Sequence, residues 1–117
     1  MLDITTLGKF FESGLYQSIR NSKSVFREKR FSVSDIDRNS REKVLVQGVI
    51  DCFFENPDGS YTVVDYKTDR IKTADELVKR HKAQISYYKR AVEQMTDSKV
   101  SKMLLYSFAM SCEIEVN

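Results

Sequence analysis

Residues that commonly build disulfides or metal clusters are scarce in this 117-residue sequence, which has two cysteines, one histidine and one proline. Cys52 and Cys112 lack the spacing of a zinc motif. The sequence shows no signal peptide and no long apolar run, so we expect a reduced, cytoplasmic protein that does not enter a membrane. Basic residues exceed acidic ones by only two, so contact with nucleic acid would depend on a local basic patch. The length suits one domain, residues 1–117.

Two apolar segments joined by a turn are the most informative part of the sequence. Residues 44–55 and 61–67 are rich in β-branched and aromatic side chains, and Asn56-Pro57-Asp58-Gly59 has the composition of a turn, which together predict a β-hairpin. If the glycine takes the left-handed position of a three-residue loop, the register places Asp51 opposite Asp65. The opposite face of the first strand then carries Val46, Ile50, Cys52 and Phe54.

The predicted register brings two carboxylates and one ammonium group onto one face of the hairpin. Lys67 follows Asp65 by two residues and therefore shares its face. Two like charges about 5 Å apart repel by about 3 kcal/mol at an effective dielectric near 20, and a divalent cation bound by Asp51 and Asp65 would offset that repulsion. Carboxylate ligands suit Mg²⁺ or Mn²⁺. The alternative is that both aspartates are solvated on the polar face of a half-exposed hairpin.

The rest of the sequence predicts an α/β sandwich with a mixed sheet. Arg27, Lys29 and Arg30 suit an edge strand or a surface that faces phosphates. The predicted elements outside the hairpin are a helix over residues 4–20, a strand over 25–33, a mobile loop over 34–43, a helix or helix pair from Thr73 to about 95, a buried strand over 100–110 and a short strand over 112–116.

Gln84 and Tyr88 lie one turn apart in the predicted helix and share a face with apolar residues. They could line a site, or Tyr88 could be core and Gln84 its rim, and spacing alone favours neither reading. The charged run 79–82 could contact a DNA backbone, although such runs usually form a solvated face. His81, within that run, is a weak candidate for a metal ligand.

Three motifs in this order resemble the RecB-type nucleases of the PD-(D/E)XK superfamily: Gly48-Val-Ile-Asp51, Val64-Asp65-Tyr66-Lys67 and Gln84-Ile-Ser-Tyr-Tyr88. Further segments resemble the C-terminal nuclease domain of AddA-type helicase-nuclease subunits: Phe10-Phe11-Glu12-Ser13, Arg27-Glu28 with Phe31, Asp65-Tyr-Lys-Thr-Asp69 and Leu105-Tyr-Ser-Phe-Ala109. The resemblance implies a three-layer restriction-endonuclease-like sandwich, with a mixed sheet flanked by helices. It also implies a metal-dependent DNA exonuclease.

The resemblance also assigns roles to the residues of these motifs. Asp51, Asp65 and the backbone carbonyl of Tyr66 would bind Mg²⁺, with Mn²⁺ as an alternative. Lys67 would position or activate the attacking water, and Gln84 and Tyr88 would lie beside the metal. The parent protein would be an ATP-dependent helicase-nuclease that processes double-strand DNA ends for recombinational repair. Its partners would be DNA ends and a second, AddB-type subunit.

One departure from the RecB-type pattern affects these expectations. Such nucleases carry a metal-binding histidine on a helix upstream of the hairpin, and no histidine precedes His81 here. We therefore expect an N-terminally truncated C-terminal fragment that self-associates through uncovered apolar surface. Glu12 and Glu28 are the alternatives for the missing ligand. The rival reading is a catalytically inactive nuclease-fold module used for DNA binding or subunit contact.

Overall fold

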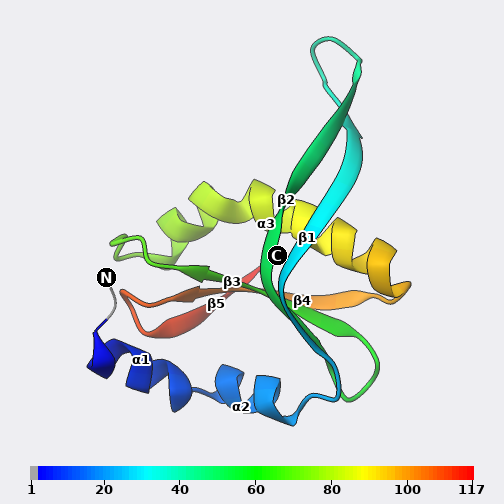
Figure 1. Ribbon diagram of the computed structural model, residues 1–117. Coiled ribbons are helices and arrows are strands. Elements are labelled where there is room, and N and C mark those ends of the chain that lie inside the picture. The colour runs from blue at the N-terminus through cyan, green and yellow to red at the C-terminus, as the bar shows by residue number, and fades with distance from the viewer. Residues whose placement is uncertain (1–2) are drawn as a thin grey trace.

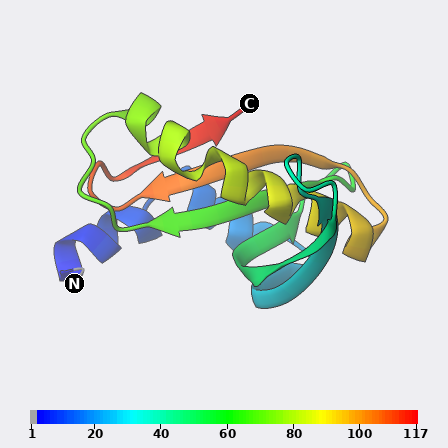
Figure 2. The ribbon, with the colours of Figure 1, turned by 90° about the horizontal axis from the view of Figure 1, so that it is seen from above.

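The computed structural model describes residues 3–117, which form three helices and five strands. The strand order is β1-β2-β3-β4-β5, and β3 and β4 run parallel. The helices α1 and α2 cover one face of the sheet and α3 lies across the other (Figures 1 and 2), which confirms the predicted three-layer α/β architecture. No helix in the described residues is long and apolar enough to cross a membrane. The elements are α1 (Ile4–Phe11), α2 (Gly14–Asn21), β1 (Val25–Ile36), β2 (Lys43–Glu55), β3 (Tyr61–Lys67), α3 (Ala74–Thr96), β4 (Val100–Ser107) and β5 (Cys112–Val116).

The β2–β3 hairpin has the register that its turn residues predict. Cys52 pairs with Val64, and in the turn the Asn56 amide donates a hydrogen bond to the Ser60 carbonyl at 2.7 Å. Gly59 has a φ of 89°, the left-handed conformation that this loop requires. The ladder ends at the Cys52 pair, one position before the two aspartates of the motifs. Their side chains therefore lie where β2 and β3 separate.

β1 and β2 continue beyond the rest of the sheet as a two-stranded arm (Figure 1). β2 pairs with β3 only over residues 52–55, whereas its pairing with β1 reaches the tip of the arm. The expected loop over residues 34–43 is therefore wrong, because strand pairing leaves only residues 37–42 for the turn. The Tyr87 hydroxyl of α3 donates to the Asp35 carboxylate at 2.7 Å. Hairpin pairing between β1 and β2 and this contact with α3 order a segment whose local sequence has no period.

The sheet has a separate hydrophobic core on each face, one against α3 and one against α1 and α2. We expected Ile50 to share a face with Cys52, but Ile50 packs in the α3 core and Cys52 in the other. The alternation breaks between them at Asp51. Opposite Asp51, Glu28 has a φ of 51°, and these two residues are absent from an otherwise continuous ladder. Such an irregularity re-aims side chains locally.

Residues 4–20 form two short helices, so the single helix that we predicted is wrong. The break lies at Ser13, whose side chain accepts a hydrogen bond from the Tyr16 amide at 3.1 Å and so caps α2. Its hydroxyl also donates to the Phe10 carbonyl at 2.6 Å. These local bonds outweigh the apolar periodicity, which continues through the break.

Gly48, the first residue of the first motif, permits close packing of β1 on β2. A Cβ atom there would lie 2.8 Å from Cε1 of Phe31, whose ring packs edge-on against Tyr88 with the ring centroids 5.4 Å apart.

We predict that Gly48→Ala lowers the free energy of unfolding in urea by about 1–3 kcal/mol, the usual cost of overpacking. At the control position Gly14, an added Cβ meets no atom within 4 Å, so Gly14→Ala should not destabilise the chain. Equal stability of both variants would contradict this account.

Candidate active site

Asp65 of β3 is a buried carboxylate with incomplete hydrogen bonding. The residue is 2% exposed, and its Oδ2 accepts no hydrogen bond from any group in residues 3–117. The Lys67 ammonium lies 3.1 Å from this oxygen, so the contact is an ion pair without hydrogen-bond geometry. A buried charged oxygen without donors is costly. The position therefore favours either a proton or a further ligand.

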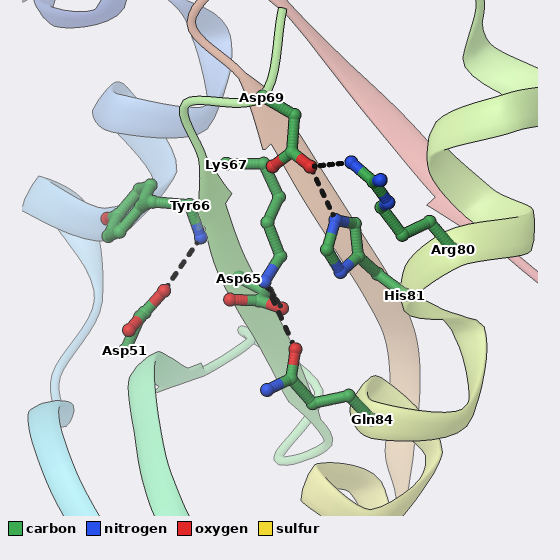
Figure 3. Close-up of polar contacts among 8 residues, drawn as sticks. All are labelled: Asp51, Asp65, Tyr66, Lys67, Asp69, Arg80, His81 and Gln84. Carbon is green, nitrogen blue, oxygen red and sulfur yellow. Dashed lines mark hydrogen bonds and ion pairs between the residues drawn. The ribbon is translucent and has the colours of Figure 1, made fainter. Parts of the chain in front are cut away.

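Asp51, within β2, approaches the same place from the neighbouring strand, where its pairing with β3 has ended (Figure 3). Because the β2–β3 ladder has already ended, the Tyr66 amide bonds to a side chain, donating to Asp51 Oδ2 at 2.9 Å. Asp51 is half-buried, in contrast to the fully buried Asp65. The structure thus brings together the aspartates of the first two motifs, as the predicted register requires.

The surroundings of Asp65 raise its pKa to about 7. Burial is the largest cause, and the neighbouring Asp51 carboxylate adds to it. The Lys67 ammonium acts in the opposite direction but offsets only part of the rise. Asp65 therefore binds a proton readily near neutral pH, and a cation that replaced this proton would relieve the same electrostatic cost.

Lys67 joins β3 to α3 across the site. Besides its ion pair with Asp65, its ammonium donates to Gln84 Oε1 at 3.1 Å (Figure 3). The second and third motifs, which lie on different elements, therefore meet through one hydrogen bond. The Lys67 side chain is only 15% exposed. Its charge is consequently held in a defined place next to the two carboxylates.

Tyr88 lies one turn beyond Gln84 and belongs to the core against α3. Burial raises its pKa to about 12, and the Asp65 and Asp51 carboxylates add to this effect. The hydroxyl therefore stays neutral at physiological pH while it lies near the acidic pair. Gln84, in contrast, is exposed. This helix face is thus core at Tyr88 and open at Gln84, which bonds to Lys67.

An ionic cluster that we did not predict from the sequence borders the site (Figure 3). Asp69 Oδ2 lies 3.0 Å from Arg80 Nη1 and 3.2 Å from His81 Nε2. His81 is thus a partner of Asp69. The sequence positions could have indicated this cluster, because Asp69 follows Lys67 by two residues and His81 precedes Gln84 by three. The cluster ties the segment after β3 to the first turns of α3.

The oxygen atoms of the site suit a hard divalent cation. Asp65 offers an oxygen that lacks a donor, and Asp51 offers a second carboxylate beside it. Carboxylate oxygens are typical ligands of Mg²⁺ and Mn²⁺, which retain several waters. No group of three His, Cys, Asp or Glu side chains within residues 3–117 could hold a metal ion. Two carboxylates would therefore need backbone oxygen or water to complete the coordination.

The two acidic residues considered for the missing histidine lie in different places. Glu28 lines an open recess together with Arg27, Asp51 and Tyr66. Glu12 is an exposed residue that caps the end of α1. Glu28 is therefore the better placed of the two, although it does not complete a three-side-chain ligand group in the described residues.

Comparisons with known proteins place this geometry in a wider context. Residues 7–114 match the family described as the PD-(D/E)XK nuclease superfamily. The chain is 35% identical over 133 aligned positions to an ATP-dependent helicase/nuclease subunit from Clostridium perfringens, covering 100% of the chain and 10% of that protein. It is 38% identical over 112 positions to the protein of the same name from Clostridium kluyveri, covering 86% of the chain and 9% of that protein. The chain therefore spans about a tenth of the length of these relatives.

Among solved structures, the crystal structure of SSO0001 has a similar fold. The two superpose with a TM-score of 0.58 at 20% sequence identity, covering 95% of this chain and 50% of the other. At this level of identity the likeness concerns the fold, and it agrees with the mixed sheet and flanking helices described above.

The raised pKa of Asp65 makes the stability of the metal-free chain depend on pH. The folded-state pKa of about 7 exceeds the unfolded value of about 3.9. The stabilising contribution of the Asp65 proton is thus fully present below about pH 4 and is lost as the pH rises through about 7. We predict that the chain in EDTA loses more stability between roughly pH 5 and pH 8 than its Asp65→Asn variant, as measured by urea denaturation.

The matched control is Glu42→Gln, which removes an exposed carboxylate in the turn of the arm. This variant should lose as much stability over the same pH range as the wild-type chain. If Asp65→Asn behaved like the control, the burial of the Asp65 carboxylate would not be the source of the pH dependence.

Proposed function

This chain belongs to the PD-(D/E)XK nuclease superfamily, and on that basis we propose that it is a Mg²⁺-dependent DNA exonuclease domain. The observation that carries the metal assignment is the buried Oδ2 of Asp65, which has no hydrogen-bond donor in the described residues. Asp51 lies beside it and contributes to its raised pKa. Asp51, Asp65 and the backbone carbonyl of Tyr66 are the proposed ligands, and Mn²⁺ could replace Mg²⁺.

The bound metal ion would polarise the scissile phosphate and assist departure of the 3′ oxygen. The chain's own residues would position the other reactants. Lys67, held between Asp65 and Gln84 at 3.1 Å from each, would orient the attacking water and stabilise negative charge that develops on the phosphate. Gln84 would keep this ammonium in place, and the neutral Tyr88 hydroxyl would support the buried side of the site.

The clostridial relatives are named as subunits of an ATP-dependent helicase/nuclease, and this chain corresponds to about a tenth of their length. We extend to this chain the role that such a name implies. It would be the nuclease domain of a larger helicase-nuclease subunit that works with a second, AddB-type subunit. The substrate would be double-strand DNA ends that are processed for recombinational repair.

A second function is a catalytically inactive module that binds DNA or another protein of the complex. One observation favours it, namely that residues 3–117 contain no group of three side chains able to hold a metal ion. The two functions differ in their requirement for metal. Direct measurement of metal binding therefore separates them.

We predict that Mg²⁺ or Mn²⁺ raises the stability of the wild-type chain at about pH 8. A ligand at a hundred times its Kd stabilises the folded state by about 2.7 kcal/mol, which thermal denaturation detects readily. Asp51→Ala and Asp65→Ala should abolish this gain, while Glu42→Gln should keep it. An equal gain in all variants would place the cation elsewhere and would favour the inactive module.

We also predict the consequence for cleavage by the whole helicase-nuclease with its partner's nuclease inactivated. Asp65→Ala and Lys67→Ala should each reduce cleavage of end-labelled DNA by about a hundredfold or more, the usual effect of losing a pre-organised electrostatic contact. ATP-driven unwinding should continue, because neither residue belongs to the motor. Lys102→Ala, which removes an exposed lysine on β4, should leave cleavage unchanged. Cleavage near the wild-type rate in both active-site variants would refute the nuclease proposal.

A further inference from the structure

One face of the β1–β2 arm is not covered by any element within residues 3–117. On the opposite face, Phe31, Val33 and Ile50 pack into the α3 core. On the uncovered face the alternate residues are exposed, and Arg30 pairs with Val49 there. The other exposed residues of this face, which we call the arm face, are Ser32, Ser34, Leu45 and Gln47.

The arm face adjoins the Asp51 side of the candidate active site. An open recess on the arm is lined by Arg30, Phe31, Ser32, Gln47, Gly48 and Val49. The next recess is lined by Arg27, Glu28, Asp51 and Tyr66. The two recesses share the same pair of strands, and Asp51 is one of the two aspartates of the site. A molecule lying along the arm face would therefore reach Asp51 without leaving the surface.

The basic residues of the arm are available for an external anion. Arg27, Lys29 and Arg30 are exposed, and none of them forms an ion pair with a carboxylate in the described part of the chain. Arginine is suited to phosphate because its planar guanidinium can donate two parallel hydrogen bonds. At about 3.3 Å per residue, Arg27 and Arg30 are about 10 Å apart along β1. This separation spans more than one phosphate of a DNA strand.

The remaining side chains of the arm face match a nucleic acid better than a protein partner. Gln47 and Ser32 offer hydrogen bonds to sugar and phosphate oxygens. Val49 and Leu45, which are 44% and 61% exposed, offer apolar contacts to bases. The centre of a protein interface is usually depleted of charge, whereas Arg30 lies within the arm face and Arg27 lines the recess at its active-site end. The Glu28 carboxylate repels phosphate locally. The attraction of this surface for phosphate therefore comes mainly from Arg27 and Arg30.

We propose that the arm face binds the backbone of a single DNA strand and leads it to the Asp51–Asp65 site. The inference rests on the proposed nuclease function for its substrate class and adds the path of the strand and the residues that hold it. Arg27 and Arg30 bind phosphates, and Gln47 lies between the arm tip and the site along that path.

The test measures binding without cleavage, using the chain in EDTA and a fluorescein-labelled oligothymidylate in anisotropy titrations at several salt concentrations. Arg27→Ala and Arg30→Ala should each weaken binding about three- to tenfold. Each should also reduce the slope of log affinity against log salt by about 0.7, the value for one phosphate contact to a single strand. Gln47→Glu, which adds a negative charge at an exposed position, should weaken binding by a similar factor.

The controls are Arg38→Ala, in the turn of the arm, and Lys102→Ala, on β4, which should bind like the wild-type chain. Each variant is compared by thermal denaturation, so Arg30→Ala and Gln47→Glu still test the proposal if Arg27→Ala fails to fold. Wild-type affinity in these folded variants, or no binding by the wild-type chain at low salt, would overturn the proposal. A wild-type dimer that Gln47→Glu dissociates would also overturn it, because the arm face would then belong to a second copy.

The outcome is separable from that of the nuclease proposal. Because Asp65 belongs to the proposed metal site, its variants are compared in the cleavage assay alone, and the arm variants in the binding assay. Loss of cleavage in Asp65→Ala with unaltered binding by the arm variants would remove only the proposed strand path. Retained cleavage in Asp65→Ala and Lys67→Ala with weakened binding by the arm variants would leave a DNA-binding surface without the proposed chemistry.

Discussion

The burial of one carboxylate, that of Asp65, is the constraint on which the site depends. Water cannot solvate its Oδ2, and the described residues offer this oxygen an ion pair with Lys67 but no hydrogen bond. Gln84 fixes the ammonium from α3, and Asp51 adds a second negative charge from β2. The strands and the helix of the three motifs therefore meet at a position whose charge the protein balances only in part. Incomplete balance of this kind is typical of sites that bind a metal ion or handle protons.

The sheet creates this position by ending a ladder early. The pairing of β2 with β3 ends at Cys52 and Val64, and the part of β2 that precedes Cys52 pairs only with β1 in the arm. Asp51 and Asp65 therefore have no backbone pairing with each other. The Tyr66 amide then bonds to the Asp51 side chain. On the other side of β3, parallel pairing with β4 continues through Lys67. One side of β3 thus stays rigidly paired while the other opens, which holds Asp65 firmly and leaves room beside it.

The residues of turns and helix caps made much of the secondary structure predictable. The wrong predictions, a single helix over residues 4–20 and a loop over residues 34–43, come from competing local hydrogen bonds and from contacts with distant elements. The turn ending in Gly59 sets the hairpin register, and Thr73 caps α3 where the sequence indicates. Ser13 breaks a helix that apolar spacing would continue. β1 and β2 pair as far as Ile36 and Lys43, and Asp35 is bonded to Tyr87 of α3, a contact that no local pattern encodes.

Within the site, the residues of the three motifs lie together as the sequence predicts, but the contact between Asp69 and His81 went unforeseen because it joins residues on separate elements.

The open edges of the sheet also influence how copies of the chain can meet. β1 forms one edge, with basic Arg27, Lys29 and Arg30, and β5 forms the other, with acidic Glu113 and Glu115. A twofold symmetric dimer that extends a sheet must place an edge against its own copy. Like charges would then face each other across the new ladder, which is a common protection of exposed strands against aggregation.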